Sequence, residues 1–376
     1  MRINILATLL SVALALPIDQ LSVDNSDVRL VELAPGERYY MTPEQLLRAK
    51  QDGVNYIDVT DHEDDIKSGS FTTSSENSPA QIPTSVQQRD LFEELSPSLS
   101  KEELELKLTT FSAFYTRYAK SETGLESSLW VYDKACEYAG GRDDVEVTKF
   151  DHEWDQKSVI VSIKGTENPD KVVIVGAHQD SINLLLPGTL PAPGADDDGS
   201  GTVTTLEVLR VLLESGFKPA NTLEFHYYSA EELGLLGSQD VFAEYAERHV
   251  DVRTMLQQDM TGYSAGSKEA NDGQDELGVI TDFVDEDLTN FIKLLITEYC
   301  SIPYVETQCG YACSDHSSAS KYGYQSAFVI ESSFDNIDRK IHTTEDKVEY
   351  LDFDHMLEHA KLTLGYALEL STLEDL

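Results

Sequence analysis

An apolar run that ends in a histidine restricts the fold of this sequence more than any other feature. Residues 172–177 do not alternate between apolar and polar side chains, and His178 and Asp180 follow them closely. A continuous run of this kind is typical of a strand that is buried on both faces. The sequence therefore predicts a parallel or mixed sheet that is covered by helices, with polar groups at the end of one strand.

Other potential metal ligands also follow strand-like segments. Three aspartates stand between glycines in the segment 194–199, and Glu231 and Glu232 follow the segment 222–228. Because sites form at the carboxyl ends of the strands in an open α/β sheet, we expect these clusters to converge. The candidate ligands are His178, Asp197, Glu232, Asp259 and His342.

Strand-like and helix-like segments alternate along most of the chain. The predicted strands are 145–150, 158–163, 172–177, 222–228, 253–260, 278–281 and 326–331. The predicted helices are one that begins after Ser100 with a capping box to Glu103, and 127–138, 199–213, 233–248, 288–299 and 355–370. This alternation indicates an α/β fold with a mixed, mostly parallel central sheet that is flanked by helices.

The composition limits the classes of partner. The chain has 376 residues, of which 40% are hydrophobic, and this suffices for one large core or for one core and a smaller domain. Lys and Arg number 28 against 68 Asp and Glu, which gives a net charge of −40. This charge repels phosphate backbones and anionic membranes, so we expect no nucleic acid and no membrane as partner.

The first 15 residues have the pattern of a signal peptide. Arg2 supplies a positive charge, residues 3–12 are mostly apolar, and Ala13-Leu14-Ala15 resembles a signal peptidase site. The alternative is a buried N-terminal helix. The signal predicts a secreted, extracellular protein, with a vacuolar destination as the alternative.

Residues 16–85 form a predicted pro-segment and linker. A strand is expected at 28–33 and a short helix at 43–49, and residues 67–85 have the polar composition of a linker. Such a segment would assist folding or cover the site until it is removed, and the alternative is a permanent N-terminal appendage. The catalytic domain is expected at 86–376.

The sequence contains four cysteines: Cys136, Cys300, Cys309 and Cys313. In an exported protein they indicate up to two disulfides. Cys309 and Cys313 are close enough in sequence for a local disulfide, and the alternative is that the thiols bind zinc. Cys136 and Cys300 either pair with each other or stay free.

The five candidate ligands suit zinc, which accepts nitrogen and oxygen donors. Five protein ligands are too many for one tetrahedral zinc with an open position, but they suffice for two zinc ions that share a carboxylate. Asp197 is the expected bridge because the neighbouring glycines let the backbone come close. Each ligand also has an ordinary structural alternative as a scaffold histidine, a helix cap or an exposed carboxylate.

Two further carboxylates have predicted roles beside these ligands. Asp180 stands two residues after His178, where it could accept the second ring N–H and orient the imidazole. Glu231 adjoins Glu232 and would act as general base on the bridging water, then deliver the proton to the leaving amine. The alternative for Glu231 is a spare surface carboxylate.

These segments resemble the motifs of the two-zinc leucine aminopeptidase family, and most closely those of its secreted fungal members. The likeness covers roughly residues 90–376 and implies a zinc exopeptidase-like fold. The motifs are His178-Gln179-Asp180-Ser181, 193–201, 229–238, Gln258-Asp259-Met260, 309–316 and Ile341-His342-Thr343-Thr344.

The resemblance assigns a role to each matching position. It implies that His178 and Asp259 hold one zinc, that Glu232 and His342 hold the other, and that Asp197 bridges them. It implies that Glu231 is the acid and base. Tyr311 is similar to the tyrosine that steadies the oxyanion, in a loop that a Cys309–Cys313 disulfide would fix. A cis peptide bond is implied after the bridging aspartate.

Apolar residues near these motifs are expected, by the same resemblance, to line the pocket for the first substrate side chain. They are Met260, Ile280, Phe328, Ile330, Phe334, Ile337 and Ile341. Apolar walls favour Leu, Phe or Met as the first residue. The alternative is that most of these residues belong to the core.

The sequence is therefore interpreted as a monomeric metallo-aminopeptidase that releases apolar residues from peptides with a free N-terminus. One alternative is a carboxypeptidase-like or glutaminyl-cyclase-like enzyme of the same fold. A carboxypeptidase needs cationic groups for the substrate carboxylate, and only Lys321, Arg339 and Lys340 stand near the motifs. Another alternative is a non-catalytic binding ectodomain.

Overall fold

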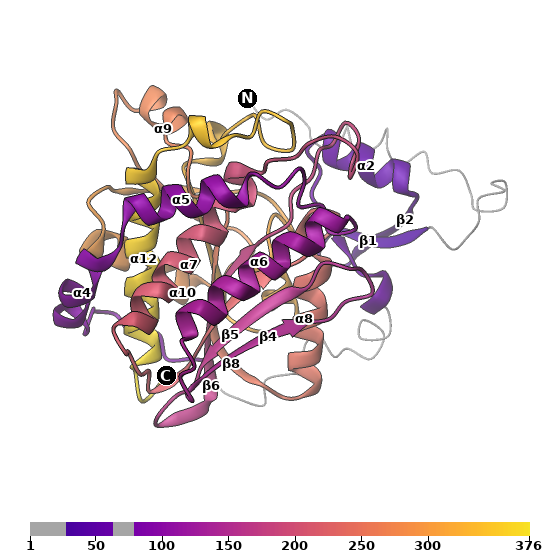
Figure 1. Ribbon diagram of the computed structural model, residues 1–376. Coiled ribbons are helices and arrows are strands. Elements are labelled where there is room, and N and C mark those ends of the chain that lie inside the picture. The colour runs from indigo at the N-terminus through magenta and orange to yellow at the C-terminus, as the bar shows by residue number, and fades with distance from the viewer. Residues whose placement is uncertain (1–27, 63–78) are drawn as a thin grey trace.

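The computed structural model describes residues 28–62 and 79–376, and its largest element is a sheet of eight strands (Figure 1). The strands lie in the order β10 (Tyr304–Thr307), β9 (Leu277–Ile280), β11 (Ser326–Ile330), β8 (Asp251–Gln258), β6 (Asn168–His178), β7 (Asn221–Tyr228), β5 (Ser158–Ile163) and β4 (Val145–Phe150). The four strands β11, β8, β6 and β7 run parallel. Antiparallel pairs join β5 to β7, β4 to β5 and β9 to β11. The predicted mixed α/β fold is confirmed.

Helices cover both faces of the sheet, as the apolar run in β6 predicted. Val173 and Val175 point into the main core, while Val172 and Ile174 point into a second core on the other face, since successive side chains of a strand alternate. The main core is closed by α5 (Lys101–Phe111), α6 (Glu122–Ala139), α7 (Gly201–Glu214), α10 (Glu286–Tyr299) and α12 (Phe353–Ser371). The second core is closed by α8 (Leu236–Glu247) and α11 (His316–Lys321).

Local signals set several helix ends. Ser100 caps α5 by accepting the Glu103 N–H, but the predicted return bond is wrong, because the Ser100 N–H donates to Glu207 Oε1 at 2.7 Å. Helix α6 begins earlier than expected because Ser121 is its N-cap, and it ends at Gly140, whose φ of +56° suits glycine. The sequence interpretation missed the short elements α4 (Arg89–Leu95), α9 (Ala265–Ala270), α11 and β10.

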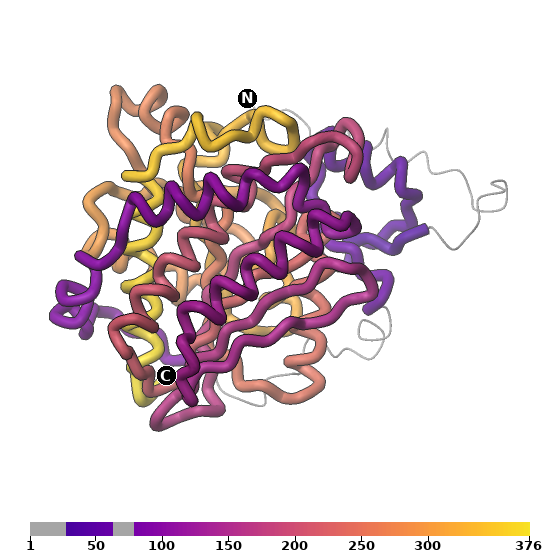
Figure 2. The backbone as a smooth tube through the Cα atoms, viewed as in Figure 1, coloured from indigo at the N-terminus to yellow at the C-terminus, as the bar shows by residue number. Residues whose placement is uncertain are grey.

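Residues 28–62 form a small unit, here called the N-terminal module. It contains the sheet β2-β1-β3, made of β1 (Arg29–Ala34), β2 (Glu37–Met41) and β3 (Ile57–Asp58), and the helix α2 (Pro43–Gln51). The indigo segment in Figure 2 shows this module at one end of the molecule. The strand predicted at 28–33 and the helix predicted at 43–49 are confirmed as β1 and α2.

The predicted signal peptide, residues 1–15, lies outside the described residues, as does most of the predicted linker. The boundaries at residues 15 and 85 therefore stay predictions. Within the described part of the chain, no helix combines the length and apolar character that a membrane span requires.

Candidate metal centre

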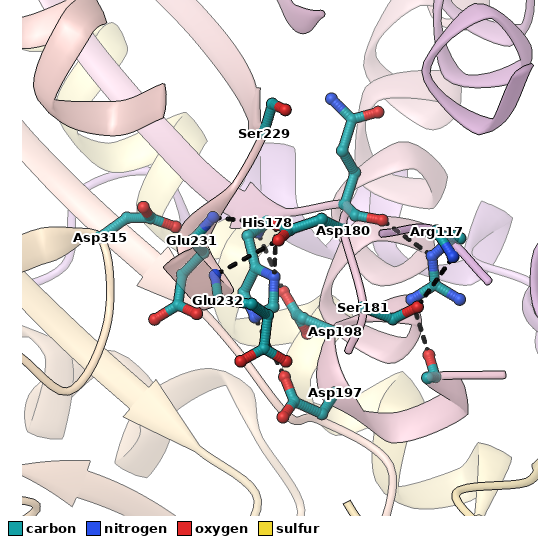
Figure 3. A network of polar contacts seen from close by, with 12 residues as sticks. Arg117, His178, Asp180, Ser181, Asp197, Asp198, Ser229, Glu231, Glu232 and Asp315 are labelled. Carbon is teal, nitrogen blue, oxygen red and sulfur yellow. Dashed lines mark hydrogen bonds and ion pairs between the residues drawn. The ribbon is translucent and has the colours of Figure 1, made fainter. Parts of the chain in front are cut away.

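The carboxyl ends of three adjacent parallel strands carry three of the five predicted ligands, and the predicted base Glu231 beside one of them. His178 is the last residue of β6, Asp259 directly follows β8, and Glu231 and Glu232 follow β7 after a short turn. The strands stand side by side in the order β8, β6, β7. Figure 3 shows His178, Glu231 and Glu232 close together at these strand ends. The convergence predicted from the sequence therefore occurs at this edge of the sheet.

Asp197 lies between the two histidines. Its Oδ1 is 3.1 Å from Nε2 of His178, and its Oδ2 is 2.8 Å from Nε2 of His342. The turn that carries Asp197 starts after Gly194, which has a φ of +52°, and the Asp197–Asp198 peptide bond is cis, as the resemblance implied. One carboxylate thus contacts two imidazoles, which is the arrangement a bridging ligand requires.

The remaining two predicted ligands complete the two halves of the cluster. Asp259 Oδ1 lies 3.5 Å from His178 Nε2, and Glu232 Oε2 lies 3.2 Å from His342 Nε2. All five residues are therefore neighbours, although 164 positions separate His178 from His342 in the sequence. His342 is the most open of them, with a quarter of its side chain exposed.

Asp198 also approaches His178 and Asp259, but its oxygens are already bonded to the main chain. It accepts the N–H groups of His178 at 3.1 Å, Gly201 at 2.8 Å and Met260 at 3.0 Å. Asp198 therefore ties together β6, the start of α7 and the segment after β8. The two carboxylate oxygens of Asp197 instead face the two histidines. Asp197 therefore suits the bridging position, and Asp198 supports the loops around it.

The charges of the cluster fit divalent metal ions. Oε1 of Glu232 and Oδ1 of Asp259 are buried and have no hydrogen-bond partner among the described residues. Burial disfavours a charged imidazole, but Glu232 and Asp197 outweigh it and raise the pKa of His342 to about 10. Burial similarly opposes charge on His178, and Asp259 and other carboxylates raise its pKa. The site thus attracts positive charge, and nitrogen with carboxylate oxygen is a donor set that zinc accepts.

Asp180 lies where the sequence placed it, beside His178. Its Oδ1 is 3.3 Å from Nδ1 of His178, the ring nitrogen that faces away from Asp197. The same carboxylate accepts the N–H groups of Glu231 at 3.0 Å and Glu232 at 3.3 Å. Asp180 therefore couples the ends of β6 and β7, a function that the spacing alone did not reveal.

Glu231 is buried next to the cluster. Its main-chain N–H donates to Asp180, and its carboxylate points in a different direction (Figure 3). Burial raises the pKa of Glu231 well above its usual value, while Lys50 and His178 oppose the rise. Glu232 differs: burial would raise its pKa, but His342 and Lys50 outweigh burial and lower it. Two adjacent glutamates thus differ in basicity because only one of them faces His342.

Tyr311 is held by a partner that the sequence did not suggest. Its hydroxyl donates a hydrogen bond to Glu32 Oε1 in the N-terminal module. Burial and this bond to Glu32 raise the pKa of Tyr311, so its proton stays on the phenol. The loop is closed by a disulfide between Cys309 and Cys313, as expected, whereas Cys136 and Cys300 are free.

The residues expected to line the first substrate pocket form one apolar cluster. It contains Met260, Ile280, Phe328, Ile330, Phe334, Ile337 and Ile341, and the disulfide sulfurs pack against it. Phe334 and Ile341 are only partly buried, whereas Phe328 and Ile330 are nearly inaccessible. Met260 directly follows Asp259 in the chain, and the cluster is separate from the two large cores.

The three cationic residues considered for a carboxypeptidase have other partners. Lys321 Nζ lies 2.7 Å from Glu32 Oε1, and Lys340 Nζ lies 3.3 Å from Asp338 Oδ1. Arg339 donates to the main-chain oxygen of Asp335 at 2.7 Å. These contacts give no cluster of cations directed at the five ligands.

Backbone strain is concentrated around the ligands. Ala230, Met260 and His342 have φ values of 55°, 59° and 59°, in the left-handed region that side chains other than glycine rarely adopt. Ala230 precedes Glu231, and Met260 follows Asp259. Residues in such conformations persist where the surrounding structure holds them, and they are frequent at functional sites.

The chain is similar in sequence to known peptidases. The sequence model of Peptidase family M28 matches residues 158–367. Leucine aminopeptidase 1 of Penicillium rubens is 52% identical over 350 residues, which cover 91% of this chain and 89% of that protein. Leucine aminopeptidase 1 of Emericella nidulans is 52% identical over 351 residues, which cover 91% of this chain and 88% of that protein.

Solved structures show the same architecture. The crystal structure of the LapA aminopeptidase of Legionella pneumophila matches with a TM-score of 0.77 and 26% sequence identity. The match covers 94% of this chain and 96% of that one.

Proposed function

This chain belongs to peptidase family M28, as its motifs predicted, and from that premise we propose that it is a secreted leucine aminopeptidase with two zinc ions. Zinc-dependent aminopeptidase activity, a hydrolase activity, follows from the family and from relatives with 52% identity. The number of metal ions, the residue that acts as base and the extracellular location are the proposed parts.

The observation that carries the proposal is the position of Asp197 between His178 and His342. Its two oxygens lie 3.1 Å and 2.8 Å from the two Nε2 atoms. A carboxylate that bridges two metal ions needs one oxygen directed at each half of the site. We assign Asp259 and His178 to one zinc and Glu232 and His342 to the other.

Two divalent ions held in this way would polarise a water molecule and the carbonyl group of the scissile bond. Glu231 would take the proton of that water and later give it to the leaving nitrogen, a role that its position beside the ligands and the rise of its pKa through burial support. Tyr311 donates a hydrogen bond to the carbonyl oxygen as negative charge develops there, once its bond to Glu32 has been released.

The proposed substrates are peptides with a free N-terminus and an apolar first residue. Met260 directly follows Asp259 and Ile341 directly precedes His342, so a first side chain would lie against the apolar cluster that contains them. Secretion is proposed from the signal-like residues 1–15 alone.

Hydrolysis of Leu-p-nitroanilide in the presence of zinc, by wild-type protein and by Glu231→Gln, tests this function. We expect the substitution to lower kcat by about 10²-fold or more, since general acid–base catalysis contributes at this level. Zinc content should stay at two ions per chain because Glu231 is not assigned as a ligand.

Glu244→Gln is the matched control, because the Glu244 side chain on the following helix is 45% exposed and, among the described residues, pairs only with Arg248. It should leave both turnover and zinc content unchanged. Full turnover by Glu231→Gln would contradict the role of this residue, and release of residues from the carboxyl end of a peptide would contradict the aminopeptidase activity.

A further inference from the structure

We propose that the N-terminal module inhibits the unprocessed enzyme through two side chains, Lys50 at the metal ligands and Glu32 at Tyr311. The inference rests on the proposed function, because it concerns groups to which that function gives roles. It goes beyond steric covering, since it assigns inhibition to two specific charged contacts.

Lys50 brings a positive charge to the carboxylates of the site. Its Nζ lies 2.7 Å from Glu232 Oε2 and 3.8 Å from Glu231 Oε2. Only 12% of the Lys50 side chain is exposed. The Lys50 ammonium group and Nε2 of His342 contact the same oxygen of Glu232, Oε2.

Glu32 restrains the second reactive group from β1 of the same module. Its Oε1 accepts the hydrogen bond of the Tyr311 hydroxyl and contacts Lys321 Nζ at 2.7 Å. Its Oε2 accepts from Arg38 Nε at 2.6 Å. Glu32 is 2% exposed, so this arrangement is part of a packed interface. A tyrosine that donates to Glu32 has no hydroxyl proton left for a substrate oxygen.

Further contacts between the module and the rest of the chain hold Lys50 and Glu32 at the site. The Asp58 N–H donates to Gly234 O at 3.0 Å, and Gln239 Nε2 donates to Asp58 O at 2.8 Å. Leu30, Ile57 and Val59 form one apolar cluster with Leu235 and Ala312. The module thus docks on the loop that carries Glu231 and Glu232 and on the loop that carries Tyr311.

Lys50 and a metal ion compete for the same carboxylate. An ion held by Glu232 and His342 would lie next to the ammonium group, and the two positive charges repel each other. Metal binding at this position therefore weakens docking of the module, and docking weakens metal binding by the same factor, since such coupling is reciprocal. The unprocessed chain should bind its second zinc ion less tightly than the processed chain.

Full-length Lys50→Met and Lys50→Gln are compared with full-length Arg48→Met. Arg48 is a matched control, because it is an exposed cation on the same helix that pairs with Asp52 alone within residues 28–62 and 79–376. Zinc binding is measured by equilibrium dialysis and turnover with Leu-p-nitroanilide. We expect both Lys50 variants to bind the second zinc about tenfold more tightly than Arg48→Met, with a similar gain in kcat/KM, which corresponds to about 1.4 kcal/mol.

Glu32→Gln tests the second contact, with Glu44→Gln on α2 as its control. Glu32→Gln should raise kcat of the full-length chain with little change in zinc affinity, because Glu32 contacts Tyr311 and no proposed ligand. After cleavage at a protease site inserted between the module and residue 79, and removal of the module, wild type and the five variants should have the same activity.

Equal zinc affinity and equal kcat/KM for full-length Lys50→Met, Lys50→Gln and Arg48→Met would overturn the inference. Full activity of the uncleaved wild-type chain would also overturn it. If the cleaved wild-type chain with zinc does not turn over the substrate, the proposed function fails instead, and the zinc affinities of the Lys50 variants still decide whether this contact opposes metal binding.

Discussion

Arg117 positions the loops of the metal centre through the main chain. Its buried guanidinium donates to the carbonyl oxygens of Gln179 and Gly194, each at 2.8 Å, and to that of Pro193 (Figure 3). These oxygens belong to the loops that carry His178 and Asp197. Burial lowers the pKa of Arg117 to about 10 against the pull of nearby aspartates, so it remains charged at neutral pH.

Arg117→Lys should weaken zinc binding, because an ammonium group cannot donate to three carbonyl oxygens in the fixed directions of a guanidinium. We expect zinc affinity to fall about tenfold or more, with a loss of stability of about 3 kcal/mol, as for other disrupted buried charges. Zinc titration and thermal unfolding of the metal-free protein measure the two effects separately.

Arg142→Lys is the control for this change. Arg142 also donates to main-chain oxygens, those of Leu213 and Phe217, but it lies in the turn between α6 and β4, away from the ligands. It should lose stability without losing zinc affinity. Equal zinc affinities in the two variants would show that Arg117 has no special role in the site.

Among the elements, α12 is a central helix of the main core. It contacts α5, α7 and α10 and lies against β6 and β7, the strands that end at the site. Asp352 is its N-cap, and the Asp352 side chain accepts the N–H groups of Asp354 at 2.9 Å and His355 at 3.4 Å. The other carboxylate oxygen accepts from Lys268 Nζ at 2.5 Å and from Ser264 Oγ at 3.0 Å.

Asp352→Asn should show a stability loss that depends on pH. Burial raises the pKa of Asp352, but Lys268, Ser264 and the Asp354 N–H outweigh it and lower the pKa to about 2. A carboxyl group with a lower pKa in the folded state stabilises the fold at pH values above its pKa in the unfolded chain, which is near 3.8. This stabilisation is lost as the pH falls through about 2. The free energies of unfolding of the two proteins should differ at pH 7 and converge between pH 4 and pH 2.

Asp352→Ala distinguishes the contribution of helix capping to stability from the contribution of the negative charge. Asparagine still caps a helix, whereas alanine does not, so the alanine variant should lose about 1 kcal/mol more. Urea unfolding at several pH values measures both effects. A constant difference between wild type and Asp352→Asn down to pH 2 would contradict the role of the charge.

For the whole molecule, the main electrostatic problem is the concentration of buried acids around one end of the sheet. Buried carboxyl groups there are Asp180, Asp196, Asp197, Asp198, Glu231, Glu232, Asp259, Asp315 and Asp346. The cationic side chains beside them are His178, His342, Arg117 and Lys50. Removal of the module takes Lys50 away, which leaves the site more dependent on metal ions.

Chelation of zinc should therefore lower the unfolding temperature of the processed enzyme. Ligand binding to the folded state stabilises it by about 2.7 kcal/mol when the free ligand exceeds its Kd 100-fold, so the unfolding temperature should rise with zinc concentration. Calorimetry over a zinc series checks this dependence, and Asp197→Asn should abolish it, since Asp197 is shared by both halves of the site. A zinc-dependent unfolding temperature in Asp197→Asn would contradict the bridging role.

Much of the fold and the ligand set could be predicted because the relevant signals are local. The apolar run before His178 predicted a doubly buried strand, and the glycines around Asp197 predicted a close turn. Parallel strands bring their carboxyl ends to one edge of a sheet, so the order of strands and polar residues was enough to bring Asp259, His178 and Glu232 together. Short elements such as α9 and β10 were missed because their length gives too little periodicity.

The sequence by itself determined the kind of chemistry: which side chains can bind metal ions, and which strand ends present them. Only the tertiary structure decided what those side chains contact. Lys50 reaches Glu232 across 182 positions and Glu32 reaches Tyr311 across 279, and neither pairing leaves a periodic or local pattern. Such contacts depend on how the surfaces of two distant parts of the chain fit together, and that fit is set by packing across the whole interface rather than by any one segment.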